Sequence, residues 1–294
     1  MAYVYLIFGA VFGVAKGFFG KKASGYLSKT VDSVKINALR MVFSVLIGLF
    51  FVILSRGFFG FAIGLWELLI SVVSGVSISL FTVCWLILVK NHAYLLMDVF
   101  LTFGSIVPIL LCSIFFGEKT NARQILGVAV LTLSAFCMCK YNNKIKGKTT
   151  LKTVALLILT GAFHGMVSFS QKWWTKSAES SVGTYNFYTY LVSSILLLIA
   201  LIVIKNKESE AQPLKLGRAR LLNVLAIAIC MFLNSLFLTY SAKILPAFII
   251  YPLKQGISLI LSLIMSAIFF KESIKPIAVI GMALCFASML LINA

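Results

Sequence analysis

Residues 183–204 read GTYNFYTYLVSSILLLIALIVI, a stretch without a single charged side chain. An α-helix rises about 1.5 Å per residue, so about 20 apolar residues cross a hydrocarbon core roughly 30 Å thick. Because lipid offers no hydrogen bonds, the backbone groups of such a stretch must bond within it, which favours a helix. The stretch therefore predicts a membrane-spanning helix.

Comparable stretches recur along the whole chain. Of its 294 residues, 61% are hydrophobic and 12% are charged, whereas soluble domains carry about 25% charged residues. The stretches also lack the alternation of apolar and polar residues that membrane β-barrels show. We expect an all-α membrane protein with ten transmembrane helices, at residues 3–20, 34–55, 66–89, 92–116, 122–140, 152–174, 183–204, 220–241, 246–270 and 276–293.

The polar segments between these spans are short, and the longest are residues 141–150 and 206–216. Neither is long enough to fold as a soluble catalytic or regulatory domain. The first span has no basic segment before it and no signal-peptidase site after it, so we interpret it as a span. The six cysteines all lie inside apolar stretches without metal-ligating neighbours, and no metal or cofactor is expected.

The chain carries an internal repeat. A shift of 154 residues aligns SIFFGE at 113–118 with AIFFKE at 267–272, each at the end of a predicted span. The same shift aligns Gly127 with Gly281, Ala129 with Ala283 and Ser134 with Ser288. A repeated hydropathy pattern is a strong indicator of transporter architecture.

The starts of the two halves correspond as well. A shift of 152 residues aligns GAVFG at 9–13 with GAFHG at 161–165. We therefore predict two five-helix repeats, at 1–141 and 142–294. Because five is odd, the second repeat enters the membrane from the opposite side, which makes the repeats inverted.

These residues carry a family resemblance. One span ends in Phe-Phe-Gly-Glu-Lys at 115–119 and is followed by a span that contains glycine, and a similar pattern occurs in the second half. This arrangement resembles the ten-helix EamA-type members of the drug/metabolite transporter superfamily. The chain departs from that pattern at Phe12, where the family often has Trp before Gly, and at Lys271, where it has Gly before Glu. The resemblance implies transport of a metabolite such as an amino acid, a drug or a nucleotide sugar.

The positive charges are distributed unevenly between alternate connections. The odd-numbered connections hold 17 Lys or Arg residues, and the even-numbered ones hold five, Arg56, Lys119, Arg123, Lys176 and Lys243. The positive-inside rule then places the odd-numbered connections in the cytoplasm and both termini on the non-cytoplasmic side of the cell membrane. Anionic lipid headgroups explain the net charge of +18 without nucleic-acid binding.

Two charged residues lie deep in mutually equivalent spans. Asp98 lies about seven residues into the fourth span and Lys254 about eight into the ninth. Because these spans start from opposite faces, both side chains are expected near the middle of the membrane, where transporters bind their substrates. Asp98 could bind the ammonium of an amino acid while Lys254 or Arg40 binds its carboxylate, or Asp98 and Lys254 could form an ion pair with each other. A third hypothesis makes Asp98 a proton-coupling site.

Six further polar or aromatic residues are candidates to line the same site, namely Tyr251, Arg40, Gln255, Trp85, Tyr188 and Asn234. Tyr251 is the strongest, because Pro252 follows it and interrupts the backbone hydrogen bonds of its helix. Lys16 and Lys172 are expected to extend to the membrane surface from their span ends. Trp174 is expected in the interfacial aromatic belt, and a lone His164 in a polar contact between helices.

The sequence favours a secondary carrier that alternates access to a midplane site and transports an amino acid or related zwitterion. The alternative is a carrier of organic cations such as quaternary amines, held by Asp98 with aromatic side chains. An enzyme is disfavoured because only one acidic residue is deep, and a channel because no filter repeat is visible. The expected partners are the small-molecule substrate, the lipid bilayer and, in a homodimer, a second copy, with a proton or sodium gradient as driving force.

Overall fold

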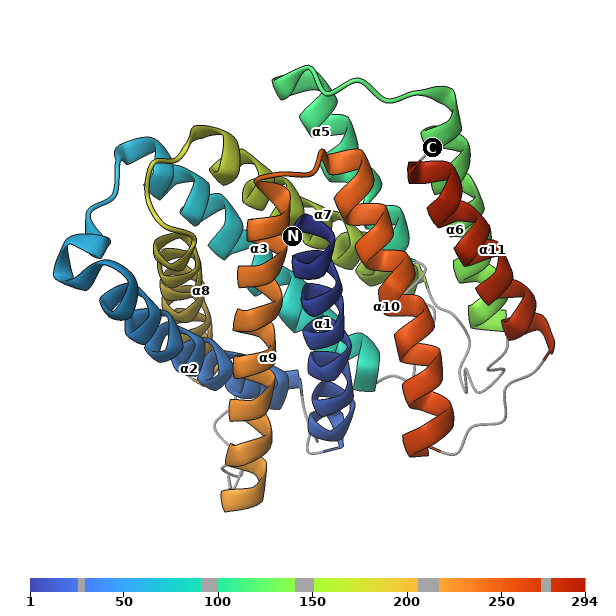
Figure 1. Ribbon diagram of the computed structural model, residues 1–294. Helices are drawn as coiled ribbons and strands as arrows, with labels where there is room; N and C mark the ends of the chain where they lie inside the picture. Colours follow the sequence, from blue (N-terminus) through green and yellow to red (C-terminus); the bar gives the residue numbers. More distant parts are fainter. Residues whose placement is uncertain (26–29, 91–99, 141–150, 206–216, 271–275, 294) are drawn as a thin grey trace.

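A computed structural model describes residues 1–25, 30–90, 100–140, 151–205, 217–270 and 276–293, and these residues form an all-helical bundle (Figure 1). Within this described part, the helices are α1 (Ala2–Ser24), α2 (Thr30–Arg56), the short 3-10 helix η1 (Gly57–Phe61), α3 (Leu65–Lys90), α5 (Ile106–Phe116), α6 (Ala122–Lys140), α7 (Leu151–Ser177), α8 (Val182–Lys205), α9 (Arg218–Ala242), α10 (Ala247–Phe270) and α11 (Pro276–Asn293).

Eight of these helices are long and apolar enough to cross a membrane, and two shorter apolar helices cover Phe100–Phe116 and Ala122–Cys137. The shorter ones occupy the fourth and fifth predicted spans, of which the fourth is described only from residue 100 onward. The predicted all-α membrane fold with ten helices is thus confirmed. The chain is a multi-pass membrane protein.

Polar and apolar side chains are distributed as lipid requires. Large apolar side chains cover the outside, for example Phe50 (61% exposed), Ile114 (73%) and Leu290 (74%), whereas Asn37 and Asn186 are completely buried. A soluble protein would show the reverse preference. The bundle therefore presents an apolar surface to the hydrocarbon chains and keeps its polar groups for contacts between helices.

Helices α6 and α11 pack side by side in antiparallel orientation (Figure 1). The Ser134 hydroxyl donates to the carbonyl of Gly281 at 2.6 Å, and the Ser288 hydroxyl donates to the carbonyl of Gly127 at 2.8 Å. These residues are repeat mates in the sequence, so exchanging the two halves converts one hydrogen bond into the other. A two-fold axis in the membrane plane produces this reciprocity.

The other large helix contacts follow the same exchange. Helix α2 packs against its counterpart α8, while the contacts α1 with α9 and α3 with α7 are related to each other by the exchange. The boundary between the halves, at 141 and 142, falls outside the described residues, and the division at that position stays a prediction.

Four described links lie at one end of the bundle, together with both chain ends (Figure 1). We call this end the terminal face; its links are residues 57–64, 117–121, 178–181 and 243–246. Helix α5 ends there at Gly117, whose φ of 64° allows the chain to turn at little steric cost for glycine. Glu272, the repeat mate of the following Glu118, lies outside the described residues.

The fourth span approaches α7 closely. A Cβ atom on Gly104 would lie 2.3 Å from the carbonyl oxygen of Gly161, and one on Gly165 would lie 2.4 Å from that of Gly104. Only glycine permits this distance between backbones. The span also changes direction at Ser105, just before α5, where Pro108 cannot donate the usual helical hydrogen bond.

Candidate functional site

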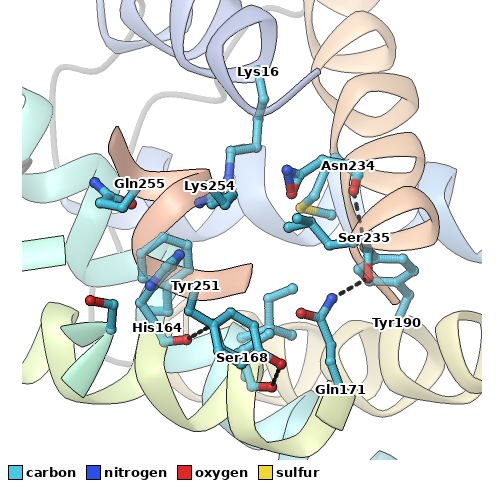
Figure 2. Close-up of a pocket in the computed structure, with 16 residues that line it drawn as sticks. Lys16, His164, Ser168, Gln171, Tyr190, Asn234, Ser235, Tyr251, Lys254 and Gln255 are labelled. Carbon is cyan, nitrogen blue, oxygen red and sulfur yellow. Dashed lines mark hydrogen bonds between the residues drawn. The ribbon is translucent and has the colours of Figure 1, made fainter. Parts of the chain in front are cut away.

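A cavity of about 60 Å³ lies inside the bundle. On the scale of roughly 10–15 Å³ per water molecule, it holds a few waters or a small polar group. Figure 2 labels its polar lining residues, Lys16, His164, Ser168, Gln171, Tyr190, Asn234, Ser235, Tyr251, Lys254 and Gln255. They come from α1, α7, α8, α9 and α10, and Ile78, Phe81 and Ser105 add lining from α3 and the fourth span.

Two helices contribute polar side chains at helical spacing. His164, Ser168 and Gln171 are four and three residues apart on α7, which places them on one face. Tyr251 and Gln255 are four residues apart on α10, and Lys254 lies on the same face. Each helix therefore presents one polar stripe to the cavity in an otherwise apolar span.

Neutral groups on one side of the cavity form a connected hydrogen-bond chain. The Gln171 Nε2 group donates to the Ser235 hydroxyl at 3.1 Å, and this hydroxyl donates to Asn186 Oδ1 at 2.7 Å. Asn234 donates from Nδ2 to the carbonyl of Gly9 at 2.9 Å. Because these amides are held by their neighbours, their orientation is fixed before any ligand binds.

A second set of contacts joins α7 and α10. The Tyr251 hydroxyl donates to the carbonyl of Ser168, and the Ser168 hydroxyl donates to that of His164 at 3.1 Å (Figure 2). The His164 ring lies 5.3 Å from that of Phe81, and its buried Nδ1 has no hydrogen-bond partner within the described residues. An unsatisfied polar atom at a cavity wall is available to a ligand or to water.

Two ammonium groups reach the cavity from opposite halves of the chain. Lys16 extends from α1 toward Lys254 of α10 (Figure 2), and like charges on two neighbouring side chains repel each other. Lys16 Nζ lies 5.6 Å from the centroid of the Phe81 ring, a cation–π distance. Arg40 adds further repulsion to Lys16.

Arg40 itself lies behind the wall and does not line the cavity. Its side chain is 2% exposed, and its Nε and Nη2 groups have no hydrogen-bond partners within the described residues. It interacts electrostatically with Tyr190, which does line the cavity. The cavity is thus bordered by a cluster of positive charge, which we call the cavity cluster: Lys16, Lys254 and Arg40.

A second buried cluster lies one helical turn beyond Ser168, toward the terminal face. Lys172 Nζ donates to the carbonyls of Ala242 at 2.9 Å and Leu245 at 2.6 Å, and lies 3.4 Å from Glu118 Oε1. Glu118 Oε2 accepts a hydrogen bond from the Ala247 amide at 2.7 Å, which caps α10. We call this group the Lys172 cluster; it connects α7, α10 and the links 117–121 and 243–246.

Another carboxylate connects two further links of the terminal face. Glu67 accepts hydrogen bonds from the amides of Gly64 at 3.1 Å, Glu179 at 2.8 Å and Ser180 at 3.1 Å, and from the Ser180 hydroxyl at 2.6 Å. It therefore joins the start of α3 to the link between α7 and α8. Two acids, Glu67 and Glu118, fix this face.

The cavity contains four of the residues predicted from the sequence, Lys254, Tyr251, Gln255 and Asn234. Asp98 lies outside the described residues, so its predicted pairing with Lys254 or with substrate stays a prediction. Within the described part of the chain, no group of three His, Cys, Asp or Glu residues could hold a metal ion.

Two predicted lining residues are used elsewhere. Trp85 is 5% exposed and fills the space beside Gly20, where a Cβ would lie 2.1 Å from its ring. The Tyr188 hydroxyl donates to the carbonyl of Phe61 at 2.7 Å, at the terminal face. The structure brings neither of them to the cavity.

Sequence reasoning missed Lys16, Ser168 and Gln171. Lys16 was expected at the membrane surface, but α1 continues to Ser24 rather than ending near residue 20, so this residue is deeper. The expectation for Lys172 was also wrong, since it is 2% exposed and fully bonded inside the bundle. The sequence signal for the α7 residues is their helical spacing, which places His164, Ser168 and Gln171 on one face of an apolar span.

The belt position expected for Trp174 is wrong too. Its side chain is 1% exposed, and its ring centroid lies 5.0 Å from that of Tyr185, with the two rings tilted by 41°. Helix α7 ends at Ser177, beyond the predicted end at 174, so this tryptophan lies further inside.

Comparison with known proteins gives a family and a fold. A model of the EamA-like transporter family matches residues 151–294, which confirms the resemblance inferred from the motifs. One solved crystal structure is similar with a TM-score of 0.77 at 12% sequence identity, over 99% of this chain and 95% of that chain. At that identity the similarity concerns the fold alone. Among curated proteins, none matches the chain significantly.

Proposed function

Because residues 151–294 belong to the EamA-like transporter family, we propose that the chain is a secondary carrier whose binding site is the central cavity. The observation that carries this proposal is the polar and charged lining of a cavity inside an apolar, lipid-facing bundle. Ionisable groups at membrane depth cost about 2.5 to 3.5 kcal/mol each on insertion scales, so they are retained where function requires them.

The position of the cavity between the halves supports alternating access. Lys16 and Phe81 come from the first predicted repeat, whereas Asn234, Tyr251 and Lys254 come from the second. In transporters with inverted repeats, rocking one repeat against the other exposes such a site to each side in turn. We expect the same movement here.

The Lys172 cluster lies one helical turn from the cavity residue Ser168, on the side of the terminal face. Opening toward that face requires Glu118 to leave Lys172 or to move together with it, because the cluster spans α7, α10 and two links. This contact is therefore the proposed gate on that side. Breaking it would favour the conformation that opens there.

The direction, the membrane and the coupling ion belong to the same proposal. The charge bias supports a cell-membrane location with the terminal face on the non-cytoplasmic side. A proton or sodium gradient would supply the driving force, with Asp98 as the candidate coupling residue. The described lining of the cavity comes from a single chain, which suits a monomer and is compatible with a homodimer.

For substrate, the sequence favours an amino acid or related zwitterion whose carboxylate would bind Lys254 and whose ammonium would bind Asp98. The alternative is an organic cation, which Asp98 would hold together with aromatic side chains such as Tyr251. What the described lining offers is a pair of ammonium groups together with neutral amides and hydroxyls. It therefore fits a small polar metabolite that carries an anionic group.

Counterflow in proteoliposomes tests the carrier proposal. Vesicles loaded with unlabelled L-serine, succinate or glycerol 3-phosphate are diluted into a trace of the same labelled compound. We expect a transient accumulation of label above equilibrium for at least one probe, because a carrier exchanges substrate for substrate. Equilibration without accumulation would indicate a channel, and the absence of any uptake would contradict transport of these classes. Protein-free vesicles and the exposed-residue variant Lys176→Met are the controls.

A further inference from the structure

A larger hollow lies on the outside of the bundle, between α5 and α6. Its volume is about 420 Å³, against about 60 Å³ for the central cavity. Phe103 is 38% exposed and Ile125 is 61% exposed, so the hollow opens toward the lipid. We call it the α5–α6 groove; its apolar walls are Phe103, Ile106 and Ile109 on one side and Ile125, Val128 and Ala129 on the other.

The groove exists because two consecutive helices do not pack together. Helix α5 packs against α7, and α6 packs against α11 (Figure 1), while α5 and α6 make little contact with each other among the described residues. Their counterparts in the second half, α10 and α11, do pack against each other. The groove is therefore a departure from the repeat symmetry and belongs to the first half alone.

The depth of the groove matches one leaflet of a bilayer. Helix α6 begins at the terminal face with Ala122, and Thr132, at the deep end of the groove, comes ten residues later. A helix rises about 1.5 Å per residue, so this distance is about 15 Å. Half of a hydrocarbon core roughly 30 Å thick is the same length. The groove thus runs from the terminal face to about the middle of the membrane.

The interior of the groove suits a hydrocarbon chain. Its walls are aliphatic and aromatic, and the Thr132 hydroxyl at the deep end already donates to the carbonyl of Val128 at 3.0 Å. An unfilled hollow leaves its lining atoms without dispersion partners. Because the groove opens into the bilayer, the acyl chain of a lipid is the apolar group that can fill it along its length.

The mouth of the groove, in contrast, is polar and basic. Thr120 and Gln124 line it, and their neighbours Lys119 and Arg123 are exposed. These are two of only five Lys or Arg residues in the even-numbered connections. The adjacent Glu118 is already held in the Lys172 cluster. Exposed basic residues at the membrane surface attract anionic headgroups, and the amino end of α6 adds the positive end of its dipole.

We infer that the α5–α6 groove binds one anionic phospholipid from the leaflet at the terminal face. An acyl chain lies along the groove, and the phosphate lies beside Lys119 and Arg123. The lipid then fills the space between α5 and the pair α6–α11. This inference goes beyond the carrier proposal, because it concerns a different surface and a ligand that is not transported.

Native mass spectrometry of the purified full chain tests the headgroup. Dioleoyl phosphatidylglycerol and dioleoyl phosphatidylcholine are added separately to the chain in detergent. We expect one phosphatidylglycerol to bind about tenfold more tightly than phosphatidylcholine. The double variant Lys119→Gln/Arg123→Gln should lose this preference. Lys176→Gln/Lys243→Gln removes the same charge from exposed positions of the same face and should keep it.

A second variant tests the acyl chain. Ala129→Phe places a ring in the groove and should weaken the binding of phosphatidylglycerol by at least about tenfold, since displacing two methylenes from an apolar site has an effect of that size. The control is Ala283→Phe, the same exchange at the repeat mate, which is exposed on α11. It should bind phosphatidylglycerol as the unmodified chain does.

Photo-crosslinking locates the lipid in the unmodified chain and needs no variant to fold. Phosphatidylglycerol with a diazirine in its acyl chain should label residues 103–109 or 124–132. Four results would overturn the inference: equal affinity for the two lipids, a preference that survives Lys119→Gln/Arg123→Gln, label that lies mainly on other helices, or lipid binding that Ala129→Phe leaves unchanged. If Ala129→Phe instead converted dimers into monomers without changing lipid binding, a second copy of the chain would be the occupant.

Discussion

Two clusters of buried cationic side chains lie within a few helical turns of each other, and their surroundings differ. In the Lys172 cluster, one ammonium group has two backbone carbonyls and a carboxylate as partners. In the cavity cluster, Lys16 faces an aromatic ring and the repulsion of two other cations, and Arg40 has two donor groups without partners within the described residues.

The difference separates structural from functional charge. A buried charge whose partners are all in place belongs to the fold, because its desolvation is already compensated. A buried charge whose bonding capacity the described residues leave unmet, such as that of Arg40, costs stability, and charges of this kind cluster at functional sites. On α7 the neutral Gln171 lines the cavity, whereas the adjacent Lys172 belongs to the Lys172 cluster, since successive helical residues point about 100° apart.

The largest effect on stability is expected from a substitution that breaks the Lys172 cluster. Glu118→Gln leaves Lys172 without its counter-charge and should lower the free energy of unfolding by about 3 kcal/mol. Reversible unfolding in mixed detergent micelles measures it. Glu179→Gln, the same exchange at an exposed position, should change the value by no more than about 0.5 kcal/mol. Equal effects of the two exchanges would show that the Lys172 cluster is not structural.

A double-mutant cycle sharpens the same point. Lys172→Met and Glu118→Gln together should cost less than the sum of the two single changes, with a coupling energy of about 1–3 kcal/mol. The reason is that the second change removes the charge that the first one left unpaired. Additive effects would mean that the 3.4 Å contact contributes nothing, and the proposed gate would lose its basis.

A substitution among the neutral residues of the cavity should have an intermediate effect on stability. Ser235→Ala removes the hydroxyl that accepts from Gln171 and donates to Asn186, so two buried groups lose a partner. We expect a loss of about 1–2 kcal/mol in the unfolding free energy. Ser55→Ala, at an exposed position, is the control. A loss no larger than the control's would mean that water replaces the hydroxyl.

The smallest effect on stability is expected in the cavity cluster. Lys16→Met should leave the free energy of unfolding unchanged within about 0.5 kcal/mol or raise it, because it relieves repulsion and, among the described residues, leaves no counter-charge unpaired. The same micelle assay measures it. A loss as large as that caused by Lys172→Met would break the comparison, since Lys16 would then be a structural lysine too.

Part of the site was predictable from local spacing. Lys254 and Gln255 follow Tyr251 by three and four residues in one span. This spacing places all three side chains on the same face of the helix. Asn234 was predicted as a single polar residue in an apolar span, by the same logic. These predictions needed only the helical period and the cost of polar groups in lipid.

Other predictions failed because they needed a helix end or a neighbour. Lys16 and Trp174 lie deeper than expected, since α1 and α7 run beyond their predicted ends. Trp85 was expected in a cavity, but Gly20 offers its ring a closer space. Such a fit depends on a residue 65 positions away in the chain, which hydropathy does not report.

The sequence by itself determined the spans, their helical form and their repeat, because an apolar segment in lipid has no other way to satisfy its backbone. It also determined that Ser134 and Ser288 correspond. Only the tertiary structure decided that each serine donates to a glycine carbonyl of the opposite repeat. It also decided that Lys16 and Lys254 line the same cavity, whereas Lys172 contacts Glu118. The rotation of each helix about its axis follows from packing between distant segments, and that rotation decides which charged side chains reach the cavity.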